Sequence, residues 1–141
     1  MLRSIRNSRY DLITGIVVQG KQLGRTIGFP TANIKPNRLF NLPKGVYGVF
    51  VNHRENRYTG VMNVGERPSF DDGNHLTYEV HVLDFNDNLY GEELTVEIAF
   101  FVRNEQKFSS LPNLIKQLNK DVLYTANRLN TTYIGGGQLH A

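Results

Sequence analysis

The sequence of 141 residues contains no cysteine. This absence excludes disulfide bridges, thiolate zinc sites and cysteine nucleophiles together, and it fits a reducing compartment. The chain also lacks an apolar run near the ~20 residues that a membrane helix requires. Its basic start is not followed by the apolar stretch of a signal peptide. We therefore expect a cytoplasmic protein that has no membrane association.

A strong charge of one sign is also missing, since 16 basic and 13 acidic residues give a net charge of +3. With 40% hydrophobic and 21% charged residues, the composition is typical of a soluble globular protein. The small basic excess gives weak support to a phosphate-bearing ligand, and an ordinary solvated surface is the simpler explanation.

No internal repeat divides the chain, and its length suits one domain with a single core. Residues 1–10 show no clear periodicity, and we interpret them as a leading arm or linker remnant. Residues 11–130 are interpreted as the domain itself. The glycines Gly135, Gly136 and Gly137 indicate that residues 131–141 form a flexible tail.

Most of this domain has the pattern of β-strands. Short runs rich in Val, Ile, Tyr and Phe are separated by Gly, Asn, Asp and Pro, which favour turns. The runs are Leu12–Val18, Gly45–Asn52, Tyr58–Val64, Leu76–Leu83 and Leu94–Val102. Two turn signals follow within the chain, at residues 71–74 (DDGN) and 86–88 (NDN). This spacing predicts an antiparallel barrel or sandwich.

One helix is predicted near the C-terminus. Ser109 or Ser110 can cap it, and Pro112 is tolerated in a first turn. Apolar residues then recur on one face at helical spacing, namely Leu111, Leu114, Ile115, Leu118, Val122, Ala126 and Leu129. We interpret this stripe as the face that packs on the barrel, and we assign no ligand to it.

The segment Gly24–Asn33, GRTIGFPTAN, is the first that could carry chemistry. Its glycines flank Arg25 and let the backbone approach a ligand closely. In an extended segment Thr31 and Asn33 project to the same side. Their oxygens are hard ligands that suit Mg²⁺ already held by nucleotide phosphates. The alternative is a turn in which both side chains bond to the local backbone.

A P-loop is rejected at residues 15–22. The sequence GIVVQGKQ matches most of the pattern GxxxxGK[ST], but Gln22 stands where the Ser or Thr belongs. The middle of the segment has the pattern of a strand, and no helical pattern follows Lys21, so the helix N-terminus that a P-loop uses is missing. Gly20, Lys21 and Gly24 can still form a flexible basic loop near phosphate.

Two further positions could carry chemistry. In Leu76–Leu83 apolar and polar residues alternate, which places Glu79 and His81 side by side on the face away from the core. A carboxylate within reach of a hydroxyl can act as a general base, here with His81 as a supporting partner. The alternative is an exposed pair of no consequence.

The loop with Arg103 and Phe108 could close over a flat ring or a phosphate, or could be a surface connector.

Taken together, these segments resemble the riboflavin kinase family, in particular the kinase module of bacterial bifunctional riboflavin kinase/FMN adenylyltransferase proteins. The resemblance covers roughly residues 10–129 in order, and its most specific motif is GFPTANI at residues 28–34. Other matching segments are GIVVQG (15–20), LPKGVYGV (42–49), GVMNVGERPSF (60–70), EVH (79–81) and RNEQKF (103–108). The resemblance implies a six-stranded antiparallel Greek-key barrel with a C-terminal helix, in agreement with the strand and helix pattern.

The resemblance also implies a function and the residues that perform it. The chain would be an ATP-dependent riboflavin kinase that makes FMN, with Mg²⁺ bound by Thr31 and Asn33. Glu79 would be the base that takes the proton from the ribityl 5′-hydroxyl of riboflavin. The ATP phosphates would be contacted by Gly20, Lys21, Gly24, Arg25, Thr31 and Asn33, and the flavin by Arg103 and Phe108.

The sequence departs from the family pattern slightly at Ser69, where a Thr is expected, and more broadly with respect to the adenylyltransferase. Its histidines form no HxGH-type motif, and the adenylyltransferase module that precedes the kinase in such proteins is absent. We therefore expect FMN but no FAD from this chain, whether it is an excised domain with that module upstream or a free-standing kinase. Its expected partners are riboflavin and ATP, with no nucleic acid, and we expect a monomer.

Three other functions stay open at this point. The first is a catalytically silent flavin-binding domain, against which the intact Thr31, Asn33 and Glu79 argue. The second is a barrel that binds single-stranded nucleic acid; such barrels interleave basic residues with aromatic residues, and the strand tyrosines here lack flanking basic rows. The third is a kinase for another small alcohol.

Overall fold

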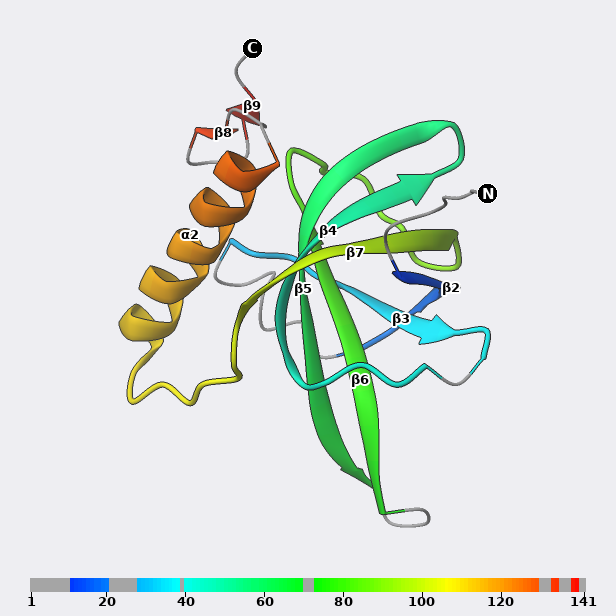
Figure 1. Cartoon of the computed structure of the whole chain (residues 1–141), viewed down its shortest axis with the longest axis horizontal. Helices are drawn as coiled ribbons and strands as arrows, with labels where there is room; N and C mark the ends of the chain where they lie inside the picture. The colour runs from blue at the N-terminus through cyan, green and yellow to red at the C-terminus, as the bar shows by residue number, and fades with distance from the viewer. Residues whose placement is uncertain are drawn as a thin grey trace, which may run out of the picture.

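A closed antiparallel barrel forms the centre of the protein (Figure 1). The computed structural model describes residues 11–20, 28–38, 40–69, 73–129, 133–134 and 138–139. The barrel strands follow the order β2-β3-β6-β5-β4-β7, so β6 lies between β3 and β5. Their bounds are Asp11–Val18 (β2), Ala32–Pro36 (β3), Gly45–His53 (β4), Asn56–Ser69 (β5), Gly73–Val82 (β6) and Glu93–Arg103 (β7).

The predicted fold class is confirmed, and so are the five predicted strands. β5 and β6 are longer than predicted, because their ladder continues to the pair Ser69 and Gly73. The pattern missed β3, which has only five residues and ends on Pro36. The first predicted turn includes residues 71 and 72, which lie outside the described residues, and the second, at residues 86–88, lies in the connection between β6 and β7.

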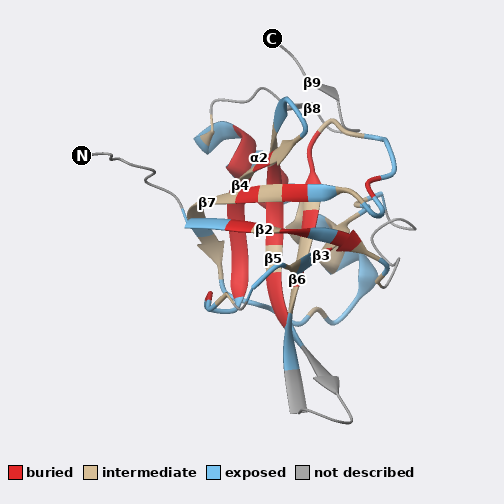
Figure 2. Ribbon diagram, turned by 90° about the vertical axis from the view of Figure 1, so that its right-hand side faces the viewer, coloured by how far each residue is buried: buried red, intermediate tan, exposed pale blue. Residues whose placement is uncertain are grey.

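Alternation along the strands fills the barrel interior with apolar side chains. On β6, Tyr78, Val80 and Val82 are at most 7% exposed, whereas the residues between them are partly exposed. Successive side chains on a strand point to opposite faces, so one set fills the core and the other faces outward. Figure 2 shows this buried centre along the barrel strands. The interior cluster also contains Val49, Val51, Met62, Val64, Leu94 and Val96, all of them 0% exposed.

The predicted helix is confirmed as α2, Leu111–Arg128, with Ser110 as its N-cap. The Ser110 hydroxyl accepts a hydrogen bond from the backbone N–H of Asn113 at 3.2 Å, which satisfies one of the free donors of the first turn. Its buried residues Val122 and Ala126 form a second apolar cluster with Val46, Val61 and Leu83 of the barrel. The helix therefore packs on the outside of the barrel, beside β4 and β5.

The C-terminal end of the described chain forms a two-stranded sheet separate from the barrel. In the segment that the sequence suggests is a flexible tail, β8 (Tyr133–Ile134) pairs with β9 (Gln138–Leu139) in an antiparallel fashion. The proposed division into arm, domain and tail stays a prediction. None of the helices in the described part of the chain combines the length and apolar character that a membrane crossing needs.

Candidate functional site

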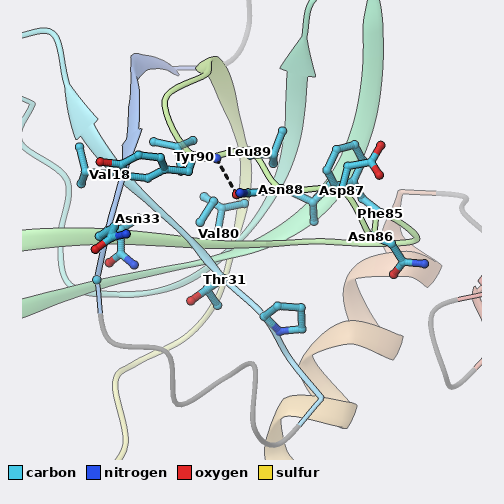
Figure 3. A pocket seen from close by; sticks show the side chains of 16 residues that line it. Val18, Thr31, Asn33, Val80, Phe85, Asn86, Asp87, Asn88, Leu89 and Tyr90 are labelled. Carbon is cyan, nitrogen blue, oxygen red and sulfur yellow. Dashed lines mark hydrogen bonds between the residues drawn. The ribbon is translucent and has the colours of Figure 1, made fainter.

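A cavity of about 550 Å³ opens beside β2, β3 and β6 (Figure 3). One wall is the end of β2 with Gln19 and Gly20, and another is the segment Pro30–Asn33 that leads into β3. The opposite wall is the connection between β6 and β7, residues 85–90. Its lining is mixed, with polar groups from Gln19, Thr31, Asn33, Asn86, Asp87 and Asn88 and apolar groups from Val17, Val18, Val80, Val82, Phe85 and Leu89.

The structure places Thr31 and Asn33, two of the residues suggested from sequence, in the lining of this cavity, and their predicted roles stay predictions. Asn33 is on β3 and pairs with Glu79 on β6, and directly opposed residues of an antiparallel pair project to the same face. Gly20 lies against the Asn33 carboxamide so closely that a Cβ at residue 20 would overlap it. Glycine at this position therefore lets the chain after β2 approach β3.

Glu79 lies next to the cavity and contacts its lining. The Thr31 hydroxyl donates to Oε1 of Glu79 across 3.4 Å, a long hydrogen bond. Because the inward neighbours Tyr78 and Val80 are buried, the partly exposed Glu79 projects to the outer face of the barrel. A hydroxyl, a carboxamide and a carboxylate thus gather at one place, although they come from sequence positions 31, 33 and 79.

His81 supports this site by holding the segment before β3. Its Nδ1 lies 2.8 Å from the carbonyl oxygen of Pro30, and its ring lies edge-on to Phe29 with 5.5 Å between ring centroids. Burial lowers the pKa of the His81 imidazole, against the opposing effects of the Pro30 carbonyl and of Asp84. Burial also raises the pKa of the Asp84 carboxyl, an effect that nearby His81 opposes. His81 therefore acts on Pro30, next to Thr31, and makes no hydrogen bond to Glu79 among the described contacts.

Arg103 is held by the helix. Its Nη2 lies 2.8 Å from Oδ2 of Asp121 and its Nε lies 2.9 Å from Oδ1, a bidentate ion pair with a carboxylate that is only 2% exposed. The guanidinium lies 5.8 Å from the centroid of the Phe108 ring. The structure thus brings Arg103 and Phe108 together at the connection between β7 and α2. Their predicted contact with a flavin stays a prediction.

A second cavity of about 280 Å³ adjoins Phe108. It lies between the connection that precedes α2 and the first turns of that helix, and it is lined by Gln106, Lys107, Phe108, Ser109, Asn113, Lys116, Gln117 and Lys120. The described part of the molecule therefore has one hollow beside Thr31 and Asn33 and another beside Phe108, each next to residues that the sequence suggests for one of the two substrates.

Three predicted contacts cannot be placed, because Lys21, Gly24 and Arg25 lie outside the described residues. The rejection of a P-loop is consistent with the structure, since Ile16–Val18 belong to β2. The sequence reasoning missed the wall formed by residues 85–90, which it took only as a turn. The Asn and Asp residues at 86–88 could have indicated a structured polar loop. In the structure Asn88 Oδ1 accepts a hydrogen bond from the backbone N–H of Tyr90 at 2.9 Å and so shapes that loop.

The oxygen ligands near Glu79 fit a divalent cation only as part of a larger set. Within the described residues, no group of three or more His, Cys, Asp or Glu side chains could hold a metal ion. The oxygens of Thr31, Asn33 and Glu79 are hard ligands, and Mg²⁺ often binds one or two protein groups together with substrate phosphates and water. The residues present therefore fit a metal that arrives with a nucleotide.

Comparison with known families gives one match over most of the chain. A family model described as Flavokinase: Riboflavin kinase matches residues 8–129. The chain is 42% identical over 117 residues to the RNA-binding riboflavin kinase RibR of Bacillus subtilis, which covers 83% of this chain and 50% of that protein. It is 47% identical over 111 residues to the bifunctional riboflavin kinase/FMN adenylyltransferase of Haemophilus influenzae, covering 78% of this chain and 36% of that protein. The chain thus spans half or less of these relatives.

Two solved structures share the fold. One is titled as a macrolide-efflux protein from Streptococcus pneumoniae; it has a TM-score of 0.79 and 37% identity, and the match covers 84% of this chain and 39% of that one. The other is riboflavin kinase from Trypanosoma brucei, with a TM-score of 0.56 and 24% identity over 84% of this chain and 79% of that one. At this identity the second match supports the barrel architecture alone.

Proposed function

Because the chain belongs to the riboflavin kinase family, we propose that it transfers the γ-phosphate of ATP to the ribityl 5′-hydroxyl of riboflavin and so forms FMN. The observation that carries this proposal is the pairing of Asn33 with Glu79 beside the larger cavity, where the Thr31 hydroxyl also donates to Glu79. The pairing sets a candidate phosphate ligand next to a candidate base on two rigid strands. Sites built on strands hold their groups more precisely than sites on loops.

The larger cavity is the proposed site of ATP. Its volume of about 550 Å³ suits a nucleotide, and its mixed lining suits a base and sugar at one end and phosphates at the other. Thr31 and Asn33 would contact the phosphates, and Gly20 would allow the backbone to come close to them. The same role is proposed for Lys21, Gly24 and Arg25, for which sequence resemblance is the support.

Mg²⁺ is the proposed metal, held by Thr31 and Asn33 together with the ATP phosphates. When bound, it would neutralise charge on the phosphates. The hydroxyl of Thr31 and the carboxamide of Asn33 carry no charge. The negative charge of the phosphates would therefore be neutralised by the metal and by nearby backbone N–H groups. Glu79 stays free for proton transfer, because it need not serve as the principal metal ligand.

Glu79 is the proposed general base. The acceptor oxygen forms a bond to the γ-phosphorus while the bond to the ADP oxygen breaks, and the hydroxyl proton moves to a Glu79 carboxylate oxygen. The Thr31 hydroxyl at 3.4 Å orients that carboxylate from the side of the cavity. Phosphoryl transfer requires little covalent work from a protein, so most of the rate should come from placing donor and acceptor in line.

The proposed flavin contacts are Arg103 and Phe108. The guanidinium of Arg103 is bound to Asp121. We therefore propose that Arg103 fixes the connection between β7 and α2, on which Phe108 lies. The ring of Phe108 is then held where it can contact the flavin. The partly exposed Phe108 borders the smaller cavity, which supports this arrangement.

The test is an incubation of the purified chain with riboflavin, ATP and Mg²⁺, followed by chromatographic separation of riboflavin, FMN and FAD. Beside it run Glu79→Gln and the control Glu93→Gln, an exposed glutamate on β7. We expect FMN from the parent and the control, and at least about 100-fold less from Glu79→Gln, since general bases contribute about 10²–10⁴-fold. No FMN with riboflavin still bound would favour the silent flavin-binding domain instead.

The wider setting of the chain is proposed on sequence alone. We expect no FAD in the same incubation, a monomer in solution, no nucleic-acid partner and a cytoplasmic location. One of the relatives supports a second module, since it is named as a bifunctional kinase and adenylyltransferase and the chain covers 36% of it. An adenylyltransferase domain upstream in a full-length protein is therefore part of the proposal.

A further inference from the structure

The wall of the larger cavity at residues 85–90 belongs to no helix or strand, so contacts outside the barrel ladder must fix its position. Backbone bonds attach its far end to β2. The Gly91 N–H donates to the carbonyl oxygen of Val17, and the Val17 N–H donates to the carbonyl oxygen of Glu92, both at 2.9 Å. Irregular segments of this kind open at lower cost than a strand does. The shape of the cavity therefore depends on what holds this wall.

One side chain, His53 at the end of β4, contacts both ends of the wall. Its ring lies edge-on to that of Phe85, with 6.3 Å between ring centroids, and its Nε2 lies 2.8 Å from Oε1 of Glu92. Phe85 also meets the ring of Tyr58 edge-on at 5.0 Å, and it lines the cavity. The side chain of His53 is only 13% exposed, yet His53 itself does not line the cavity.

The charge on Glu92 strengthens this contact. Its hydrogen bond with His53 and the charge of Arg54 lower the pKa of the Glu92 carboxyl, so the group is ionised at neutral pH. An ionised carboxylate only accepts hydrogen bonds, which makes His53 Nε2 the donor. Arg54 Nη2 lies 3.0 Å from the same oxygen, but its side chain is 73% exposed, and ion pairs in contact with water contribute little. His53 therefore makes the contact that is shielded from water.

We propose that His53 is a positioning residue for the donor nucleotide. By contacting Phe85 and Glu92 together, it holds the cavity wall in the shape that accepts ATP, without touching ATP itself. A wall that is already in place does not have to be ordered when the ligand binds, and this increases affinity. His53 thus acts on nucleotide binding and leaves the transfer step unchanged. The inference rests on the proposed function, which assigns ATP to this cavity.

The test is the steady-state kinetics of variants at the two ends of this contact. For His53→Ala we expect the KM for ATP to rise about tenfold, with kcat and the KM for riboflavin within about twofold of the parent. Glu92→Ala should also raise the KM for ATP. Glu92→Gln should raise it less, because the carboxamide oxygen still accepts from His53. If His53→Ala does not fold, the comparison of the two Glu92 variants decides the matter.

The matched control is Glu97→Ala on β7. It removes another glutamate that bonds to an arginine, because Glu97 pairs with Arg57 on β5. Glu97 is opposite Leu12 on β2, five residues from Val17 at the cavity, or about 17 Å along the strand. We expect an unchanged KM for ATP in this control.

Equal rises in the KM for ATP and for riboflavin, or a rise no larger than that of Glu97→Ala, would overturn the positioning role, while FMN formation by the parent upholds the kinase. If the parent makes no FMN, a calorimetric titration with ADP and Mg²⁺ decides. Weaker ADP binding by His53→Ala than by the parent and the control supports the role of His53 on its own, and equal binding overturns it. Absence of ADP binding to the parent overturns both proposals.

Discussion

The inner and outer faces of β3, β5 and β6 are made from alternate residues of the same strands, yet they differ in kind. The inner residues are apolar and at most 5% exposed, as in Ile34, Met62, Val64, Tyr78 and Val80. The outer residues that oppose one another at the site are Asn33, Glu79 and Asn63. One face therefore supplies stability, and the other presents polar groups that a nucleotide and an alcohol could use.

This division ties the chemistry to the fold. Because side chains alternate with a period of two, a slip of one residue in the pairing of β3 with β6 would move Glu79 into the core and Val80 out of it. The apolar inner face opposes such a slip, so it also fixes the register that places Asn33 beside Glu79. The comparison predicts that inner-face substitutions reduce stability, whereas outer-face substitutions reduce activity.

The largest effect is expected from Met62→Ala on the inner face. Met62 is 0% exposed, and removal of its side chain leaves a cavity that costs about 3 kcal/mol in the free energy of unfolding. Urea denaturation measures this loss, and steady-state kinetics at low temperature should give KM values for ATP and riboflavin within twofold of those of the parent. A large rise in either KM with little loss of stability would contradict the separation of the two faces.

Asp121→Ala tests an intermediate case, an outer contact that the helix covers. Asp121 accepts from Arg103 and from Gln117, whose Nε2 lies 2.9 Å from Oδ1, so its removal leaves a partly buried guanidinium without its main partner. We expect a loss of about 2 kcal/mol in the free energy of unfolding, below that of a fully buried pair because Arg103 can reach water. Asp121→Asn should lose less, since it keeps one acceptor. If Arg103 holds Phe108 at the flavin, the KM for riboflavin rises with the KM for ATP unchanged.

The sequence predicts the inner face better than the outer one. Alternating apolar residues at Tyr78, Val80 and Val82 are a local signal, and so is the helical stripe that ends in Val122 and Ala126. Both arise from burial, which the order of residues within one element largely determines. The short strand β3 escaped the pattern because its five residues, ANIKP, include only one fully buried apolar side chain.

Which residues are neighbours on the outer face depends on the register between paired strands, and the sequence of one strand does not determine that register. The spacing of Thr31, Asn33 and Glu79 indicated that each could carry chemistry, and resemblance suggested that they act together. The polar neighbour Asn63 was not predicted, because its closeness to Glu79 comes from the pairing of β5 with β6. The bond of Arg103 to Asp121 likewise depends on how α2 packs against the barrel.

Gly20→Ala is expected to act on the outer face alone. The new Cβ would overlap the end of the Asn33 side chain, which can rotate away at little cost in stability but then leaves the cavity. We expect kcat/KM for ATP to fall about tenfold, the loss of roughly one good polar contact, and the free energy of unfolding to change by less than about 0.5 kcal/mol. In an Asn33→Ala background the same change should have no further effect, because both substitutions remove one contact. Additive losses would show that Gly20 acts independently of Asn33.

The smallest effect is expected in the pH dependence of stability, and it comes from an outer-face residue that is partly buried. His81 is on the outer face but is partly buried against Phe29, and burial lowers the pKa of its imidazole below the ordinary value of 6.5. As pH falls through the range just below 6.5, the unfolded chain therefore binds a proton at this position more readily than the folded one does. The contribution of His81 to stability is present above that range and decreases as the pH falls, down to the lowered pKa.

His81→Asn isolates this contribution, because the asparagine amide can still donate to the Pro30 carbonyl but does not titrate. We expect the free energy of unfolding of the parent to fall more steeply than that of the variant between pH 7 and about pH 5. The carboxyl of Asp84, whose pKa burial raises, has the opposite slope, and that of Glu92, whose pKa the His53 contact lowers, has the same slope as His81. Glu92 is present in both proteins, so its contribution to the pH dependence is the same in each and cancels in the difference. The charge interaction between Asp84 and His81 does not cancel, and Asp84→Asn in both proteins removes it. If the free energies of unfolding of parent and variant depend on pH in the same way, His81 does not lower stability as the pH falls. Its imidazole would then be as accessible to water as the rest of the outer face, and the packing of Phe29 would not bury it.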